Sequence, residues 1–163
     1  MVGGRAFGPD DLRARRLGAN AWAATASDAV EVLAQLGAYA SPPPPLRPSD
    51  DYAALTLRAA ELQDRAVREL AGRSPLVAAY TSEQLARTRE DIGHIVAFLA
   101  AALYVEDERI MGEFVGWLRE VLTTRGVPAA AVDAGLDAVA AAVAELPLAS
   151  AVLHRARDGG PTG

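Results

Sequence analysis

The chain has 163 residues and a formal net charge of −5, and 51% of the residues are hydrophobic but only 6% are aromatic. This length supports one hydrophobic core, and an alanine-rich apolar fraction favours closely packed helices, so we expect an all-α, single-domain helical bundle of five or six helices. The negative charge leaves no broad cationic surface for nucleic-acid phosphates, and the absence of cysteine excludes thiol catalysis, thiolate metal sites and disulfides.

The N-terminal forty residues divide into a tail and a helical segment. Residues 1–8 include three glycines, so we predict a flexible tail. A proline and two aspartates follow, which suit the first turn of a helix, and we predict that residues 9–40 form one helix or two. Gly18 marks the place for a break, and Thr25 or Ser27 can cap the second helix.

Residues 41–50 form a proline-rich connector in our interpretation. Four consecutive prolines at positions 42–45 cannot join a helix, because proline lacks the backbone N–H that a helix uses. An extended, polyproline-like linker is therefore expected. A binding motif for a proline-reading domain is the alternative interpretation.

Apolar residues recur every three or four positions along residues 51–157, which predicts a helical bundle. Thr81 and Gln84 have the spacing of a capping box, and prolines and glycines separate the periodic segments. Residues 158–163 are predicted to be a second flexible tail. The first predicted helix follows a cap at Ser49 or Asp50 and ends at Gly72, and the second follows the Thr81 cap and ends near YVED, residues 104–107. The third covers residues 107–126, the fourth begins at Pro128 and is interrupted by Pro147, and a short last helix covers residues 148–157.

Oppositely charged residues four positions apart mark a solvated face on the first of these helices. Glu61 is expected to pair with Arg65, and Asp64 with Arg68. Such pairs are typical of a helix that exposes one side to water.

His94 is the first candidate for a functional residue. It lies between Ile92 and Ile95, at the edge of the predicted buried stripe, with Asp91 one turn before it and Phe98 one turn after it. A carboxylate that binds one imidazole nitrogen would leave the other nitrogen available to a ligand. The alternative is a histidine at the core boundary that pairs with an acid or with water.

Metal sites and catalytic sites have little support in the sequence. Asp91 and His94 form one D-x-x-H motif, whereas di-iron bundles use two carboxylate-x-x-His copies with two further glutamates. The other histidine, His154, has Ala151 three residues before it. We therefore predict no metal site, and the one enzymatic alternative is an acid–base pair of Asp91 and His94 with an unspecified substrate.

A tetrapyrrole site is the better-supported cofactor alternative, although no cofactor is specified. His94 could be the axial ligand of a haem, bilin or cobalamin, with Phe98 and Trp117 against the flat ring. Phe114 and Trp117 share a helical stripe, however, so the same aromatic residues are also the expected packing residues of the core.

The composite pattern D-x-x-H, FLAAAL and F-x-x-W-L-x-x-V-L-x-x-R-G-x-P runs from Asp91 to Pro128, within a region of resemblance that covers about residues 87–146. It resembles the helical modules that lie beside cobalamin-binding or sulfate-transporter and anti-sigma-antagonist (STAS) domains in bacterial regulators. The resemblance implies a sensory or scaffold role with His94, Trp117 and Arg125 in the site. The E-H pair that follows the tryptophan in light-sensing cobalamin bundles is absent from WLREVL.

These observations predict a non-enzymatic helical module with a sensory, regulatory or protein-interaction role. Leu, Val and Ala stripes favour self-association or binding to a protein partner. The longest uncharged apolar run, 95–105, is too short to cross a bilayer, and the N-terminal residues lack the apolar core of a signal peptide. We expect a cytoplasmic protein that binds neither membrane nor nucleic acid.

Overall fold

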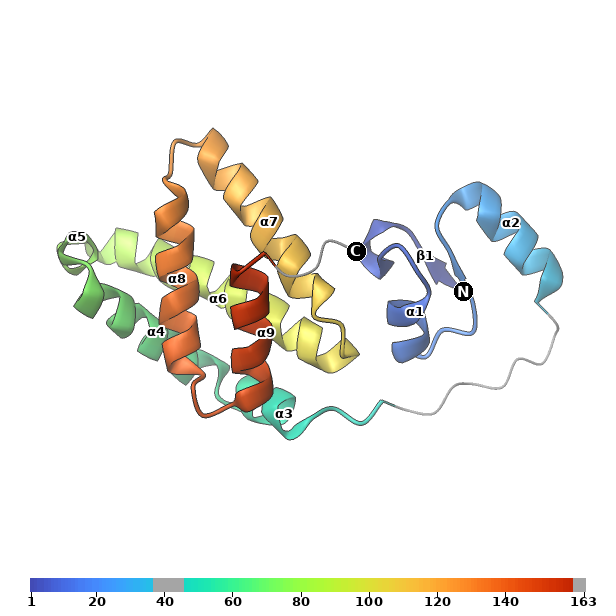
Figure 1. Ribbon diagram of the computed structural model, residues 1–163, viewed down its shortest axis with the longest axis horizontal. Helices are drawn as coiled ribbons and strands as arrows, with labels where there is room; N and C mark the ends of the chain where they lie inside the picture. Colours follow the sequence, from blue (N-terminus) through green and yellow to red (C-terminus); the bar gives the residue numbers. More distant parts are fainter. Residues whose placement is uncertain (37–45, 160–163) are drawn as a thin grey trace. The chain divides into compact units, whose positions relative to one another are not determined.

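The computed structural model describes residues 1–36 and 46–159 (Figure 1). The chain is mostly helical, at 73%, as predicted, and it also contains a two-stranded parallel sheet that the sequence analysis missed. The chain divides into two compact units. The N-terminal unit comprises Met1–Pro48 with Val105–Asp107, and the C-terminal unit comprises Ser49–Tyr104 with Glu108–Gly163.

The N-terminal unit begins with regular structure where we expected a flexible tail. Its elements are β1 (Val2–Gly3), η1 (Arg5–Phe7), α1 (Leu12–Arg16), β2 (Trp22–Ala23) and α2 (Ala26–Gln35). Val2 of β1 lies opposite Trp22 of β2, and Gly3 lies opposite Ala23. A Cβ atom at Gly3 would lie 2.3 Å from the Ala23 carbonyl oxygen, so this strand pairing requires glycine there.

A buried ion pair holds α1 inside the N-terminal unit. Arg13 Nε donates to Asp107 Oδ2 at 2.8 Å, and the two side chains are only 4% and 3% exposed. Gly8 has φ +81°, and a Cβ atom there would lie 3.2 Å from the Arg13 guanidinium. Glycine at position 8 therefore gives the backbone its left-handed conformation and leaves room for the guanidinium.

The predicted segment 9–40 contains two helices separated by β2. Thr25 caps α2 through a capping box with Asp28, so the first of the two predicted cap residues is confirmed. None of the α2 residues is buried. Residues 37–45, which include the first half of the predicted proline-rich connector 41–50, lie outside the described residues.

In the described residues, the C-terminal unit contains seven helices rather than the five predicted for residues 51–157. They are α3 (Asp50–Leu57), α4 (Ala59–Arg73), α5 (Pro75–Ala78), α6 (Ser82–Val105), α7 (Arg109–Thr124), α8 (Ala129–Ala142) and α9 (Pro147–Arg157). The Thr81–Gln84 capping box before α6 is present as predicted. None of the helices in the described part of the chain is long and apolar enough to span a membrane.

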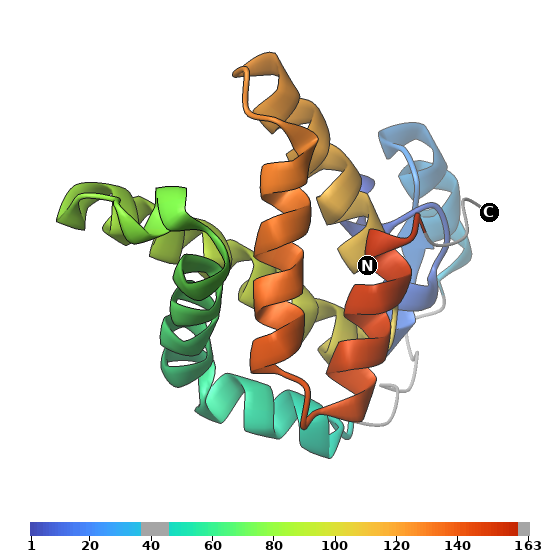
Figure 2. The ribbon, with the colours of Figure 1, turned by 60° about the vertical axis from the view of Figure 1, so that its left-hand side comes forward.

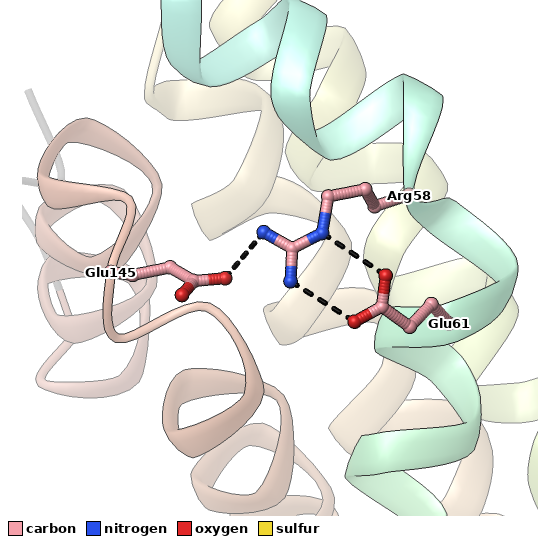
Figure 3. Close-up of polar contacts among 3 residues, drawn as sticks. All are labelled: Arg58, Glu61 and Glu145. Atoms are coloured by element: carbon pink, nitrogen blue, oxygen red, sulfur yellow. Dashed lines mark hydrogen bonds and ion pairs between the residues drawn. The ribbon is translucent and has the colours of Figure 1, made fainter.

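The predicted 51–72 helix is in fact two helices that meet at Arg58 (Figure 3). Arg58 donates from Nε and Nη2 to the two carboxylate oxygens of Glu61, each at 3.1 Å, and from Nη1 to Glu145 at 2.5 Å. The hydrogen bonds from Arg58 to Glu61, and the charge of the guanidinium, lower the pKa of the Glu61 carboxyl below its ordinary value. Arg58 thus joins the α3–α4 junction to the segment between α8 and α9.

The charged pairs that we predicted on α4 are wrong. Glu61 is paired with Arg58 rather than with Arg65. Asp64 is paired with Arg89 of α6 at 2.6 Å. The partners lie on neighbouring elements, which periodicity along one helix does not reveal.

The core of the C-terminal unit lies where α4 packs on α8 and where α9 packs on α7 and α8 (Figure 2). A Cβ atom at Gly135 of α8 would lie at ordinary contact distance from Ile95 and Ile92 of α6, at 3.7 and 3.9 Å, so these two helices pack side by side there. The largest fully buried side chains are Leu55, Leu62, Leu99, Met111, Leu136, Leu153, Val115, Val139 and Val143. Leucine and valine dominate this core, as the composition predicts.

Asp51 ties the start of α3 to the start of α9. Its Oδ2 accepts hydrogen bonds from the backbone N–H groups of Leu148 at 2.7 Å and Ala149 at 3.1 Å. Pro147 has no N–H and the Leu146 N–H donates to the Val143 carbonyl, so the carboxylate satisfies the two N–H groups that the start of α9 leaves unpaired.

Candidate functional site

Three rings of the C-terminal unit form an aromatic cluster, which we define as Phe98, Phe114 and Trp117. Phe98 of α6 stacks on Phe114 of α7 with ring centroids 4.0 Å apart and an interplanar angle of 13°. Trp117 lies 6.0 Å from Phe114 at 34°. Phe114 is only 4% exposed, whereas Phe98 is 40% exposed and Trp117 is 56% exposed. The cluster thus has a buried base and two rings in solvent.

The helical period of α7 explains why Trp117 is exposed. Met111, Phe114 and Val115 are the buried residues of this helix. Trp117 comes one turn after Phe114, so it can contact that ring while it lies at the edge of the buried stripe. The prediction that Trp117 is a core packing residue is wrong, because the centre of the stripe lies nearer Met111 and Val115.

The solvent side of α7 continues from Trp117 in both directions. We define the α7 outer face as Arg109, Gly112, Glu113, Gly116, Trp117 and Glu120. Glu113, Gly116 and Glu120 are exposed, and Arg109 and Gly112 are half-buried. A Cβ atom at Gly112 or Gly116 would meet nothing within 4 Å, so both glycines leave open space above the helix.

A polar group lies on the same two helices. Asp91 and His94 of α6 are exposed, and so is Arg125 at the C-terminal cap of α7. Partial burial raises the pKa of the Asp91 carboxyl, and Glu90 adds to this, whereas His94 and Arg125 oppose it. The structure therefore brings Asp91 within electrostatic range of both His94 and Arg125.

The four residues predicted to bind a cofactor are not equally well placed for that role. Phe98 and Trp117 come together on Phe114, as a binding surface requires. His94 is exposed to solvent, whereas a histidine that serves as the axial ligand of a haem lies against the ring in an apolar pocket. Arg125 lies near Asp91 at the far end of α7.

In residues 1–36 and 46–159, no group of three or more His, Cys, Asp or Glu side chains could hold a metal ion. The glycines and Glu120 of the α7 outer face were missed by the sequence analysis, although the G-x-x-x-G spacing in GEFVG was a signal for the two glycines.

No model of a known protein family and no curated protein matches this chain.

Proposed function

We propose that this protein is a non-enzymatic, regulatory interaction module that binds a protein chain through the aromatic cluster and the α7 outer face. The observation that carries the proposal is the exposure of Trp117 and Phe98 over a buried Phe114. Large aromatic side chains dominate the binding energy of protein interfaces, and tryptophan is especially enriched among such residues. The resemblance of residues 87–146 to helical modules of bacterial regulators supports the regulatory part.

The packing of the two rings favours binding. Phe98 is stacked on Phe114, and Trp117 contacts the same ring from one turn further along α7. A ring that already has a fixed neighbour loses little conformational freedom when a partner covers it. A partner would also remove exposed aromatic surface from water, which is the main favourable contribution to association.

A photocrosslinking experiment tests this proposal. Benzoylphenylalanine is introduced in place of Trp117, and in a matched control in place of Leu148, which is 52% exposed on α9. The protein is irradiated in extract of its native cell. We expect a specific protein adduct, to this chain or to another, from position 117 and none from position 148. Equal labelling at the two positions, or no protein adduct at position 117, would contradict the proposal.

A tetrapyrrole-binding sensor is the second candidate function. The placement of His94 one turn before the exposed Phe98 on α6 favours it. Titration with haem and with cobalamin, followed by absorption spectroscopy, tests this function. A stoichiometric visible band that is lost in His94→Ala and retained in His154→Ala would support it, and unchanged free-ligand spectra would exclude it.

A further inference from the structure

We propose that the N-terminal unit regulates the aromatic cluster through the turn that joins α6 to α7. Only residues 106–108 separate these two helices. The segment Val105–Asp107 belongs to the N-terminal unit, and the helices that flank it carry the rings of the cluster. This inference rests on the proposed function, because it concerns the regulation of the same surface.

All three residues of the turn are acidic, and each is paired with an arginine from another element. Glu106 Oε2 lies 2.6 Å from Arg16 Nη2, and Asp107 Oδ2 accepts a hydrogen bond from the buried Arg13. We call these two pairs, which both involve α1, the turn ion pairs. Glu108 is paired with an arginine of α9. Adjacent carboxylates repel one another, so the conformation of the turn depends on these arginines.

The backbone of Glu106 has a conformation that is unfavourable for glutamate. Its φ is +54°, and among residues 1–36 and 46–159 it is the one non-glycine residue with a positive φ. It directly follows α6, at a position where glycine is the usual residue because it has no Cβ atom. The side chain that glycine lacks is the one that pairs with Arg16. The ion pair therefore offsets the backbone strain, and its loss would let the turn relax.

The turn is close enough to the aromatic cluster to control it. Phe98 lies seven residues before the end of α6, and Phe114 lies five residues after the start of α7, so the rings are about 10 Å and about 8 Å along their helices from the turn. A change of about 10° in the angle between the helices would move either ring by about 1–2 Å. The two ring centroids are 4.0 Å apart, so this movement would break the stack that Trp117 also contacts.

The two tryptophans of the chain allow a direct test, because Trp22 lies in the N-terminal unit and Trp117 lies in the aromatic cluster. Protein labelled with fluorotryptophan gives two fluorine resonances, and Trp22→Phe assigns them. Arg13→Met removes the buried turn ion pair, and we expect it to shift both resonances toward their positions in the urea-unfolded protein. Arg15→Met is the matched control, since Arg15 lies on the same helix but pairs with an acid outside the turn, and it should shift neither.

A milder variant covers the case in which Arg13→Met unfolds the whole chain. Arg16→Gln removes only the exposed turn ion pair, and it should shift the Trp117 resonance in the same direction. Adding Glu106→Gly should return this resonance to its wild-type position, because glycine takes a positive φ without strain. Adding Glu106→Ala should not. A Trp117 resonance that Arg16→Gln leaves unchanged, or that both double variants restore equally, would overturn the inference, and so would an equal shift in Arg15→Met.

Photocrosslinking separates this inference from the proposed function. With benzoylphenylalanine at position 117 in extract of the native cell, Arg13→Met should lower the yield of the protein adduct about fivefold relative to Arg15→Met. An adduct yield that Arg13→Met leaves unchanged would overturn the regulation. If the otherwise wild-type protein forms no adduct, the proposed function fails, while the fluorine resonances still decide whether the turn ion pairs control the aromatic cluster.

Discussion

At the scale of single residues, two members of the aromatic cluster have different expected roles: Phe114 contributes to stability and Trp117 to binding. Phe114 is buried at the base, so Phe114→Ala should lower the free energy of unfolding by about 3–5 kcal/mol through lost packing and a cavity. Trp117 is more than half exposed, and Trp117→Ala should lower it by less than about 1 kcal/mol. Urea unfolding of the two variants at low protein concentration measures both values. Similar losses would show that Trp117 is a core residue after all.

Asp91 is expected to reduce stability at neutral pH. Its folded-state pKa is raised by partial burial, so its contribution to stability is present below the unfolded pKa and is lost as the pH rises through the folded pKa. Asp91→Asn should therefore raise the free energy of unfolding at pH 7, by less than about 1 kcal/mol because solvent screens an exposed carboxyl. Thermal unfolding at pH 7 and at pH 3 tests the sign. A lower stability of the variant at pH 7 would contradict this account.

The sequence predicted the burial of individual residues correctly only where the helical period along one segment determines which side chains are buried. It put Ile92 and Ile95 on a buried stripe, and both are buried. It placed Trp117 with Phe114 in the core, but the buried side of α7 is set by its neighbours, since Arg119 binds Asp133 of α8. The side of a helix that a distant element covers cannot be obtained from the spacing along that helix.

At the scale of helices and their ends, Asp51 is the most informative residue. Asp51→Ala removes a buried acceptor and leaves the N–H groups of Leu148 and Ala149 unpaired, which should cost about 1–3 kcal/mol. Asp50 is exposed in the same helical turn, so Asp50→Ala is the control. Hydrogen exchange should accelerate at the start of α9 in the first variant alone. Equal exchange in both variants would show that the cap contributes little.

Helix ends with local signals were predictable, and those with distant partners were not. The caps at Thr25 and Thr81 follow from residues three positions away. The break at Arg58 is accompanied by its contact with Glu145, which is far along the chain. The strand β1 is too short for a periodic pattern, and its pairing depends on the absence of a side chain at Gly3.

At the scale of the whole molecule, composition predicted a helical core but not a second compact unit. The N-terminal unit depends on the buried pair of Arg13 and Asp107. Removal of one partner leaves a buried charge, so Arg13→Met should destabilise this unit by about 3–5 kcal/mol, and Arg13→Met with Asp107→Leu by less. Hydrogen exchange across β1, α1 and β2 measures the difference. Similar protection in wild type and Arg13→Met would contradict this role.

The candidate site was predicted in part at this scale. The sequence pointed to α6 and α7, and Phe98 and Trp117 do come together there. The solvent exposure of His94 and the open glycines of the α7 outer face depend on how the helices pack, so they required the structure. The structure therefore favours an exposed aromatic surface over a pocket around His94 as the candidate site.

The most direct test of the central claim is photocrosslinking from position 117, with position 148 as a control of similar exposure. Our account predicts that benzoylphenylalanine at position 117 forms a specific protein adduct in extract of the native cell and that the same group at position 148 forms none. The absence of a protein adduct at position 117, or equal labelling at the two positions, would contradict the claim.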